Sequence, residues 1–260
     1  MKPRILTYTI NDITLKNLSN RRRNQLFGCK HAHNELTFLN RLLSFSLNST
    51  ADGELHDHAQ SIQMWCVLQI LTGKLFETWQ MLAKRVSFTK PVDPIVDTLS
   101  PDHQHSLQWL TEYFGDRNWK KSPIKLVRDT TAFHYGGIDM GQALTRLADR
   151  ENTIHLAEHP ANTLYFLGSA VVFRTIFAMV AENSKVVGEY DERVGLGART
   201  VMNDVNEANF HLHEVLYGLI KALLEEALGR QLGEAEEVTN IEGAPTADKI
   251  GLPPWLDIGQ

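Results

Sequence analysis

The stretch VMNDVNEANFHLHEVLYGLIKALLEEA, from Val201 to Ala227, decides the fold class of this chain. Apolar residues recur in it at spacings of three and four, at Val201, Val205, Ala208, Leu212, Leu216, Leu219, Leu223 and Ala227. These side chains share one face of an α-helix, because an α-helix turns once every ~3.6 residues. We therefore expect a long amphipathic helix over about 198–228.

Similar periodicity recurs through the rest of the chain. It predicts further helices over residues 31–48, 54–85, 101–115, 122–135, 140–149 and 161–182. The helix over 122–135 has start and stop signals, because Ser122-Pro123 is a capping residue followed by proline and Gly136-Gly137 favours an end. Residues 5–10 are compatible with a short strand. The sequence thus predicts an all-α fold.

The composition is that of an ordinary folded protein. The chain has 260 residues, of which 43% are hydrophobic and 22% charged, so it is neither disordered nor a disulfide-dense scaffold. Its net charge of −5 gives no global signature of nucleic-acid binding. Cys29 and Cys66 are too few for a disulfide framework and suit a reducing compartment. Residues 1–10 hold no apolar leader, and Arg174 interrupts the apolar stretch 164–180, so we expect a cytoplasmic protein with no membrane span.

No linker divides the chain, so we expect a single all-α domain over residues 30–228. Within it, residues 30–136 would form a helical bundle, and residues 137–228 would supply further helices packed on that bundle. The flanking segments are less patterned. Residues 1–29 form an N-terminal segment whose basic triplet at 21–23 is expected in a solvated turn. Residues 229–260 are expected to form an irregular tail, which Trp255 would anchor to the body.

Histidine is the conspicuous polar residue, with eleven copies. Eight of them form four His-x-His pairs, at 31/33, 56/58, 103/105 and 211/213. Two such residues on a helix lie ~200° apart and do not converge on one metal ion, so surface histidines are expected. The segment 155–159 reads His-Leu-Ala-Glu-His, the order of the inverted zinc-protease motif. Pro160 disfavours helix at His159, which indicates a polar loop instead.

The segment from Lys125 to Tyr135, KLVRDTTAFHY, holds the constellation with the clearest chemistry. Arg128 is followed by the polar Asp129 and, after five intervening residues, by His134. This motif resembles the HEPN superfamily, helical bundles in which an arginine, often followed by a polar residue, precedes a histidine by four to six intervening residues. The resemblance covers residues 30–136 as architecture and 128–135 as motif.

A local basic strip accompanies this motif. Residues 117–128, RNWKKSPIKLVR, carry five positive charges and no negative one, which leaves −10 for the rest of the chain. Such a strip offers ammonium and guanidinium groups to phosphates in spite of the acidic total. The alternative is a solvated helix entrance. The spacing from Arg150 to His155 also fits the motif, but the capped helix and the basic strip favour Arg128.

The resemblance implies a metal-independent endoribonuclease, or a degenerate relative that binds RNA, with no cofactor. On an ideal helix Arg128 and His134 lie ~120° apart around the axis and ~9 Å apart along it, so two copies across a two-fold axis would complete the site. His134 would transfer protons, and Arg128 would stabilise charge on the phosphorane. Further contacts to the substrate would come from Lys120, Lys121, Lys125, Asp129 and Tyr135, with Glu35 as a candidate orienting carboxylate. Toxin-like or phage-defence work is implied in the same way.

Two other interpretations stay open. In the first, Arg128 bridges an acidic neighbour within the bundle and His134 donates to a backbone carbonyl. In the second, the chain is a non-catalytic helical interaction protein, with its partner surface on the helices over 54–85 and 198–228.

Overall fold

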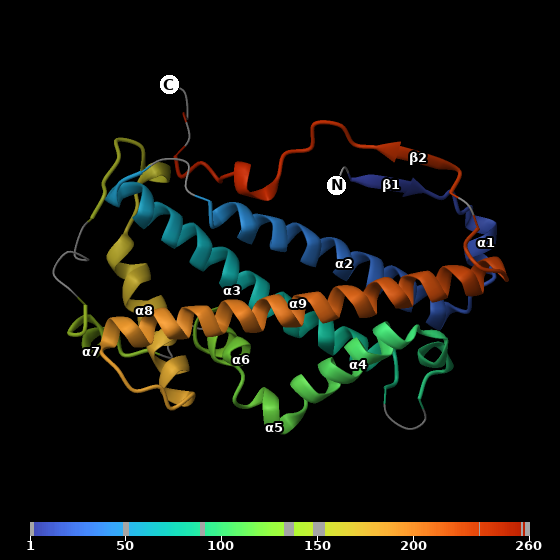
Figure 1. Ribbon diagram of the computed structural model, residues 1–260, viewed down its shortest axis with the longest axis horizontal. Helices are drawn as coiled ribbons and strands as arrows, with labels where there is room; N and C mark the ends of the chain where they lie inside the picture. Colours follow the sequence, from blue (N-terminus) through green and yellow to red (C-terminus); the bar gives the residue numbers. More distant parts are fainter. Residues whose placement is uncertain are drawn as a thin grey trace.

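Three long helices, α2 (Asn20–Ser46), α3 (Glu54–Arg85) and α9 (Tyr190–Leu228), run along the long axis of the molecule (Figure 1). The computed structural model describes residues 3–48, 52–88, 92–132, 138–147, 154–233, 235–255 and 257. The shorter elements are β1 (Arg4–Thr7), α1 (Asp12–Lys16), η1 (Pro94–Thr98), α4 (Pro101–Tyr113), α5 (Asp116–Trp119), α6 (Pro123–Val127), η2 (Arg128–Ala132), α7 (Met140–Leu144), η4 (Pro160–Asn162), α8 (Phe166–Asn183), β2 (Glu237–Asn240) and η5 (Ala247–Lys249). The all-α fold class predicted from the sequence is confirmed.

Helix α9 is the spine of the bundle, because it contacts α1, α2, α3, α4, α6 and α8. Its predicted apolar face is buried throughout, and Leu212, Leu216 and Leu219 are fully enclosed. It begins at Tyr190, earlier than the apolar repeat indicated; Val194 is already buried, and Gly197 packs against α8. A Cβ at Gly197 would lie 1.8 Å from the carbonyl oxygen of Phe177, so the two backbones touch there.

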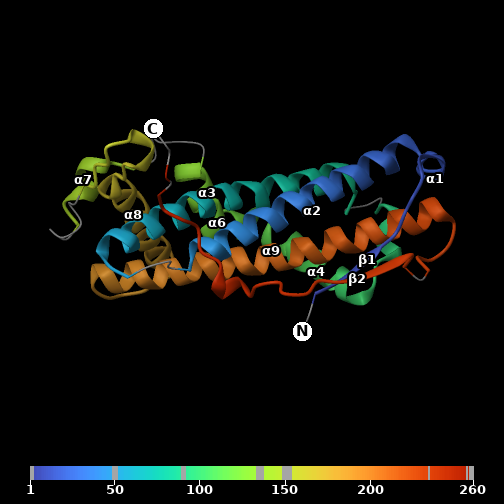
Figure 2. The same cartoon turned by 90° about the horizontal axis from the view of Figure 1, so that it is seen from above.

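The position of α9 alters the expected organisation of the bundle. Helix α4 packs chiefly on α9, and α9 also packs against both α2 and α8. Figures 1 and 2 show α9 running along the bundle beside α2, with α8 at one end of the molecule. Residues 30–136 therefore do not complete a bundle by themselves. One continuous core cluster includes residues from Leu18 to Ala227, and α8 and α9 belong to it rather than lying on it.

The first long helix begins at Asn20, before the range 31–48 that apolar spacing predicted. Ser19 caps it, with its Oγ accepting from the Arg22 amide at 3.2 Å, and Leu26 and Cys29 enter the core. The basic triplet at 21–23 lies in the first turn of this helix, so the expectation of a solvated turn is wrong. The boundary placed between residues 29 and 30 falls inside α2.

The helix predicted over 122–135 begins as expected and then changes character. Ser122 Oγ accepts from the Lys125 amide at 3.1 Å, and Pro123 opens α6. After Val127 the chain widens into the π-helical turn η2, which removes the ideal α-helical geometry assumed for the motif. His134, Tyr135 and the Gly136-Gly137 stop lie outside the described residues.

The segment after α9, expected to be irregular, contains a strand and a 3-10 turn. Strand β2 pairs antiparallel with β1, with Arg4 opposite Asn240 and Thr7 opposite Glu237. The predicted anchor is confirmed, because the Trp255 ring meets His56 edge-on at 4.9 Å. Both strands are exposed, so this two-stranded ribbon is held mainly by backbone hydrogen bonds.

Helix α8 is by length and composition apolar enough to cross a membrane, but 56% of its eighteen-residue window is buried inside the protein. Phe173 and Phe177 pack against Trp65 of α3, at ring-centroid distances of 6.1 and 5.6 Å. It is the buried core helix that the sequence predicted.

Candidate functional site

Arg128 stands where α6 gives way to the π-helical turn η2. Its guanidinium lies over the Phe76 ring of α3, 4.1 Å from the ring centroid. Nη1 donates to Asp129 Oδ1 at 2.7 Å, and Nη2 lies 3.7 Å from Glu77 Oε1. Nε is buried and has no hydrogen-bond partner among the described residues. Arg128 therefore bridges acidic neighbours, as the first of the two other interpretations expects of it. The other half of that interpretation concerns His134, which lies outside the described residues.

The carboxylate of Asp129 forms ion pairs with two cations of the basic strip. Lys125 Nζ pairs with Asp129 Oδ2 while Arg128 holds Oδ1. The five positive charges counted along 117–128 are thus partly neutralised where they approach the motif. Glu35 does not orient Arg128, because it pairs with Lys74 at 2.7 Å and His31 at 3.5 Å.

The remaining three cations form what we call the basic edge: Arg117, Lys120 and Lys121, at the connection between α5 and α6. All three are exposed, and none forms an ion pair with another described residue. Lys121 lies between two hollows of the surface. One has a volume of about 510 Å³ and includes Arg117. The other, of about 440 Å³, includes Lys120.

The second hollow, which we call the α6–α9 cavity, contains a carboxylate that the sequence did not single out. Asp204 of α9 accepts a hydrogen bond from the Tyr113 hydroxyl of α4 and another from the Ile124 amide. Burial raises the pKa of Asp204, and neighbouring Glu207 adds to this effect, against the hydrogen bond from Tyr113. Burial and the charge of Asp204 also raise the pKa of Tyr113. No local pattern joins these residues, because they lie 91 positions apart.

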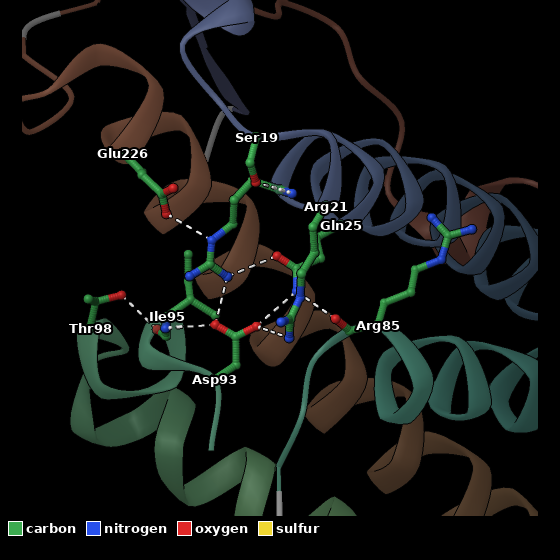
Figure 3. Close-up of polar contacts among 9 residues, drawn as sticks. Ser19, Arg21, Gln25, Arg85, Asp93, Ile95, Thr98 and Glu226 are labelled. Carbon is green, nitrogen blue, oxygen red and sulfur yellow. Dashed lines mark hydrogen bonds and ion pairs between the residues drawn. The ribbon is translucent and has the colours of Figure 1, made fainter. Parts of the chain in front are cut away.

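A second polar cluster, the Asp93 junction, lies where the loop after α3 meets the start of α2 (Figure 3). The Asp93 side chain is 2% exposed and accepts from Arg21 at 2.8 Å, Arg22 at 2.7 Å, Gln25 at 3.0 Å and the Ile95 amide at 3.2 Å. Burial alone would raise the pKa of Asp93, but these hydrogen bonds and the charge of Arg22 hold it below its ordinary value.

Further contacts extend this junction to two other helices. Arg22 Nε lies 3.2 Å from Glu226 Oε2 at the far end of α9. Gln25 also donates to the backbone carbonyl of Arg85, at the end of α3. The junction therefore ties α2, α3 and α9 together at one end of the bundle, and its acceptors are filled by groups of the protein itself.

The histidine pairs all lie on helices, where their side chains diverge. His58 and His211 are buried rather than on the surface, because His58 stacks on Phe166 at 3.6 Å and His211 on Trp109 at 4.4 Å. Burial lowers the pKa of His211. The segment 155–159 is a loop, as Pro160 indicated. Within the described residues, no three His, Cys, Asp or Glu side chains converge as metal ligands would.

The cysteines lie in different settings. Cys29 is buried, and burial raises the pKa of its thiol to about 12, which makes it a poor nucleophile. Cys66 is exposed on α3.

Comparison with known protein families, with curated proteins and with solved structures finds no significant match to this chain. Its function is therefore inferred from the side chains themselves.

Proposed function

We propose that this chain is a HEPN-like protein that binds RNA at the basic edge and cleaves it without a metal ion as a homodimer. The observation that carries the proposal is the basic edge itself: Arg117, Lys120 and Lys121 are exposed, free of partners among the described residues, and close in sequence to Arg128. Unpaired cations on a surface are the groups that bind backbone phosphates, because the release of condensed counterions favours the complex.

The proposed reaction is a transesterification. The ribose 2′-hydroxyl attacks phosphorus, the bond to the 5′ oxygen breaks, and a 2′,3′-cyclic phosphate and a free 5′-hydroxyl result. His134 takes the 2′ proton, and the His134 of the second copy returns one to the leaving oxygen. Arg128 stabilises the charge of the phosphorane. A phosphate at this position competes with Asp129 and Glu77, which hold the guanidinium over Phe76.

Cleavage is tested by incubating purified protein with a mixed RNA pool in EDTA. We expect cleavage by the wild type and none by an Arg128→Ala/His134→Ala double variant. The matched control is Arg150→Ala/His155→Ala, which removes the other arginine and histidine at motif spacing and should leave cleavage intact. Cleavage that is equal in the wild type and the Arg128/His134 variant, or absent from both, contradicts the enzymatic proposal.

Binding is tested separately, by fluorescence anisotropy of a labelled single strand. Replacing Arg117, Lys120 and Lys121 by glutamine should weaken binding and reduce its dependence on salt, because each phosphate contact contributes a slope of about −0.7 in single strands. Glutamine at Lys84 and Lys221, two exposed lysines on α3 and α9, is the control. An unchanged salt slope in the triple variant would exclude the basic edge as the phosphate-binding surface.

A second candidate function is helical interaction without catalysis, and one observation on α9 favours it. Phe210 and Tyr217 lie seven residues apart on one side of this helix and are each 58% exposed. Neighbouring exposed aromatic side chains are typical of protein interfaces. A Phe210→Ser/Tyr217→Ser variant that is monomeric beside a dimeric wild type, in light scattering, would support this function. A wild type that stays monomeric excludes both self-association here and the composite ribonuclease site.

A further inference from the structure

The α6–α9 cavity brings together three segments that are far apart in sequence. Its wall is formed by the α5–α6 connection, the end of α8 and the first half of α9, which lie side by side in Figure 1. The volume of about 440 Å³ falls within the range of roughly 300–1,000 Å³ typical of small-molecule sites. The lining residues that bear on the ligand are Lys120, Lys121, Leu126, Val180, Thr200 and Asp204.

These residues differ in chemistry from one part of the wall to another. Lys120 and Lys121 are exposed and place two ammonium groups at the mouth. Leu126 and Val180 are largely withdrawn from water and offer an apolar surface. Asp204 is half-buried and is the one carboxylate among the described residues that line the cavity. A ligand that satisfies all three regions carries an anionic group, a flat apolar body and hydrogen-bond donors.

Asp204 has acceptor capacity left over. An ionised carboxylate offers about four lone-pair positions, and here the protein fills two of them, with the Tyr113 hydroxyl and the Ile124 amide. Tyr113 also fixes the orientation of the carboxylate, because its hydroxyl donates across the α4–α9 contact. The remaining positions on a carboxylate that is partly withdrawn from water are a strong attraction for paired N–H donors.

Among the four RNA bases, guanine fits these positions best. Its Watson–Crick edge presents two adjacent donors, N1–H and the 2-amino group, which match the two oxygens of a carboxylate. Adenine and cytosine place an unprotonated ring nitrogen beside their amino group, and uracil flanks its N3–H with two carbonyls. Each of these three bases therefore places a hydrogen-bond acceptor next to a carboxylate oxygen, which repels it.

We propose that the α6–α9 cavity binds a guanine nucleotide, with the base against Leu126 and Val180, its donors on Asp204 and its phosphate on Lys120 and Lys121. The nucleotide is either free guanosine 5′-monophosphate or one guanosine of a single-stranded RNA, and only the second source rests on the proposed function. Proteins that read RNA sequence commonly do so on splayed bases of single strands.

The primary test is calorimetric titration of the full chain with guanosine, adenosine, cytidine and uridine 5′-monophosphates. We expect guanosine monophosphate to bind about tenfold or more tightly than the other three, which is the discrimination typical of a bidentate base contact. Equal affinities for all four nucleotides, or no binding of guanosine monophosphate at millimolar concentration, would overturn the proposal.

Two variants assign the contacts. Asp204→Asn keeps an oxygen for Tyr113 but offers guanine a donor, so it should remove the preference for guanine. Glu192→Gln, at an exposed position of α9 outside the cavity, should leave that preference unchanged. The Lys120→Ala/Lys121→Ala variant should bind guanosine monophosphate more weakly but bind unphosphorylated guanosine as the wild type does. The Lys84→Ala/Lys221→Ala variant should bind both as the wild type does. Circular dichroism establishes that each variant is folded. A folded Asp204→Asn protein that still prefers guanine contradicts the assignment.

A last titration separates the two sources, with single-stranded RNA that contains or lacks guanosine. Tighter binding of the guanosine-containing strand, lost in Asp204→Asn, identifies RNA as the source. Guanosine monophosphate binding with no RNA binding leaves the cavity inference standing and contradicts the proposed function. RNA binding without guanine preference, and with no mononucleotide binding, leaves the proposed function standing and contradicts the cavity inference.

Discussion

Two half-buried or buried aspartates, Asp93 and Asp204, differ in what the protein supplies to them. Asp93 receives two guanidinium groups, an amide side chain and a backbone amide, and its pKa lies below the ordinary value. Asp204 receives a neutral hydroxyl and a backbone amide, and its pKa lies above the ordinary value. A carboxylate filled by cations stabilises the fold, whereas one left without a cation beside a cavity keeps acceptor capacity for a ligand.

The largest expected effect is on the Asp93 junction. An Asp93→Asn substitution removes the buried carboxylate that pairs with Arg21 and Arg22, and leaves the largely buried Arg22 guanidinium with Glu226 as its remaining acidic partner. We expect a loss of roughly 3 kcal/mol in the free energy of unfolding, measured with urea at pH 7. Removal of an exposed carboxylate, with Asp102→Asn on α4 as the control, should cost far less. If Asp93→Asn lowers the free energy of unfolding by less than about 1 kcal/mol, Asp93 does not stabilise the fold more than Asp204 does, and the proposed difference between the two aspartates is wrong.

Acid should reproduce this substitution in the wild type. Because the pKa of Asp93 is lower in the folded than in the unfolded chain, its contribution is fully present above the unfolded value of about 3.9 and disappears as the pH falls through the folded value. The stability difference between wild type and Asp93→Asn should therefore be constant from pH 5 to 7 and shrink below about pH 4. A difference that instead shrinks between pH 5 and 7 would show that the pKa is raised.

A smaller effect is expected at Tyr113. Tyr113→Phe removes the hydroxyl that donates to Asp204, so a partly buried carboxylate loses one partner. The expected loss of unfolding free energy is about 1–2 kcal/mol. Guanine discrimination should also fall, because the carboxylate is no longer held in one orientation. Tyr217→Phe, at an exposed position on α9, serves as the control.

The smallest effect on stability is expected from Asp204→Asn, below about 1 kcal/mol at pH 7. A raised pKa means that ionisation of Asp204 opposes folding, so stability contributed by the protonated form is lost as the pH rises through the folded value. The amide avoids this cost. A loss as large as that of Asp93→Asn would assign Asp204 a purely structural role.

Local pattern predicted the parts of the fold that depend on neighbouring residues. The α9 repeat and the Ser122-Pro123 start were both correct, because apolar spacing and capping act within a few turns. The sites proved harder, because their partners meet only after folding. Asp93 and Arg22 are 71 positions apart, and Tyr113 and Asp204 are 91 apart. The motif at Arg128 predicted neither the π-helical turn that follows it nor the ion pair of Arg128 with Glu77 of α3.

The place of α9 in the core has a consequence for synthesis on the ribosome. The helices α2, α3 and α4 emerge first, yet each of them packs against α9, which is near the other end of the chain. The end of α9 is held by the start of the chain, because the Asn17 side chain donates a hydrogen bond to the Ala227 carbonyl. At 5–20 residues per second, translation of the 39 residues of α9 takes roughly 2–8 s. During that time the nascent chain presents an apolar face that chaperones bind, and contacts of such long sequence separation form late.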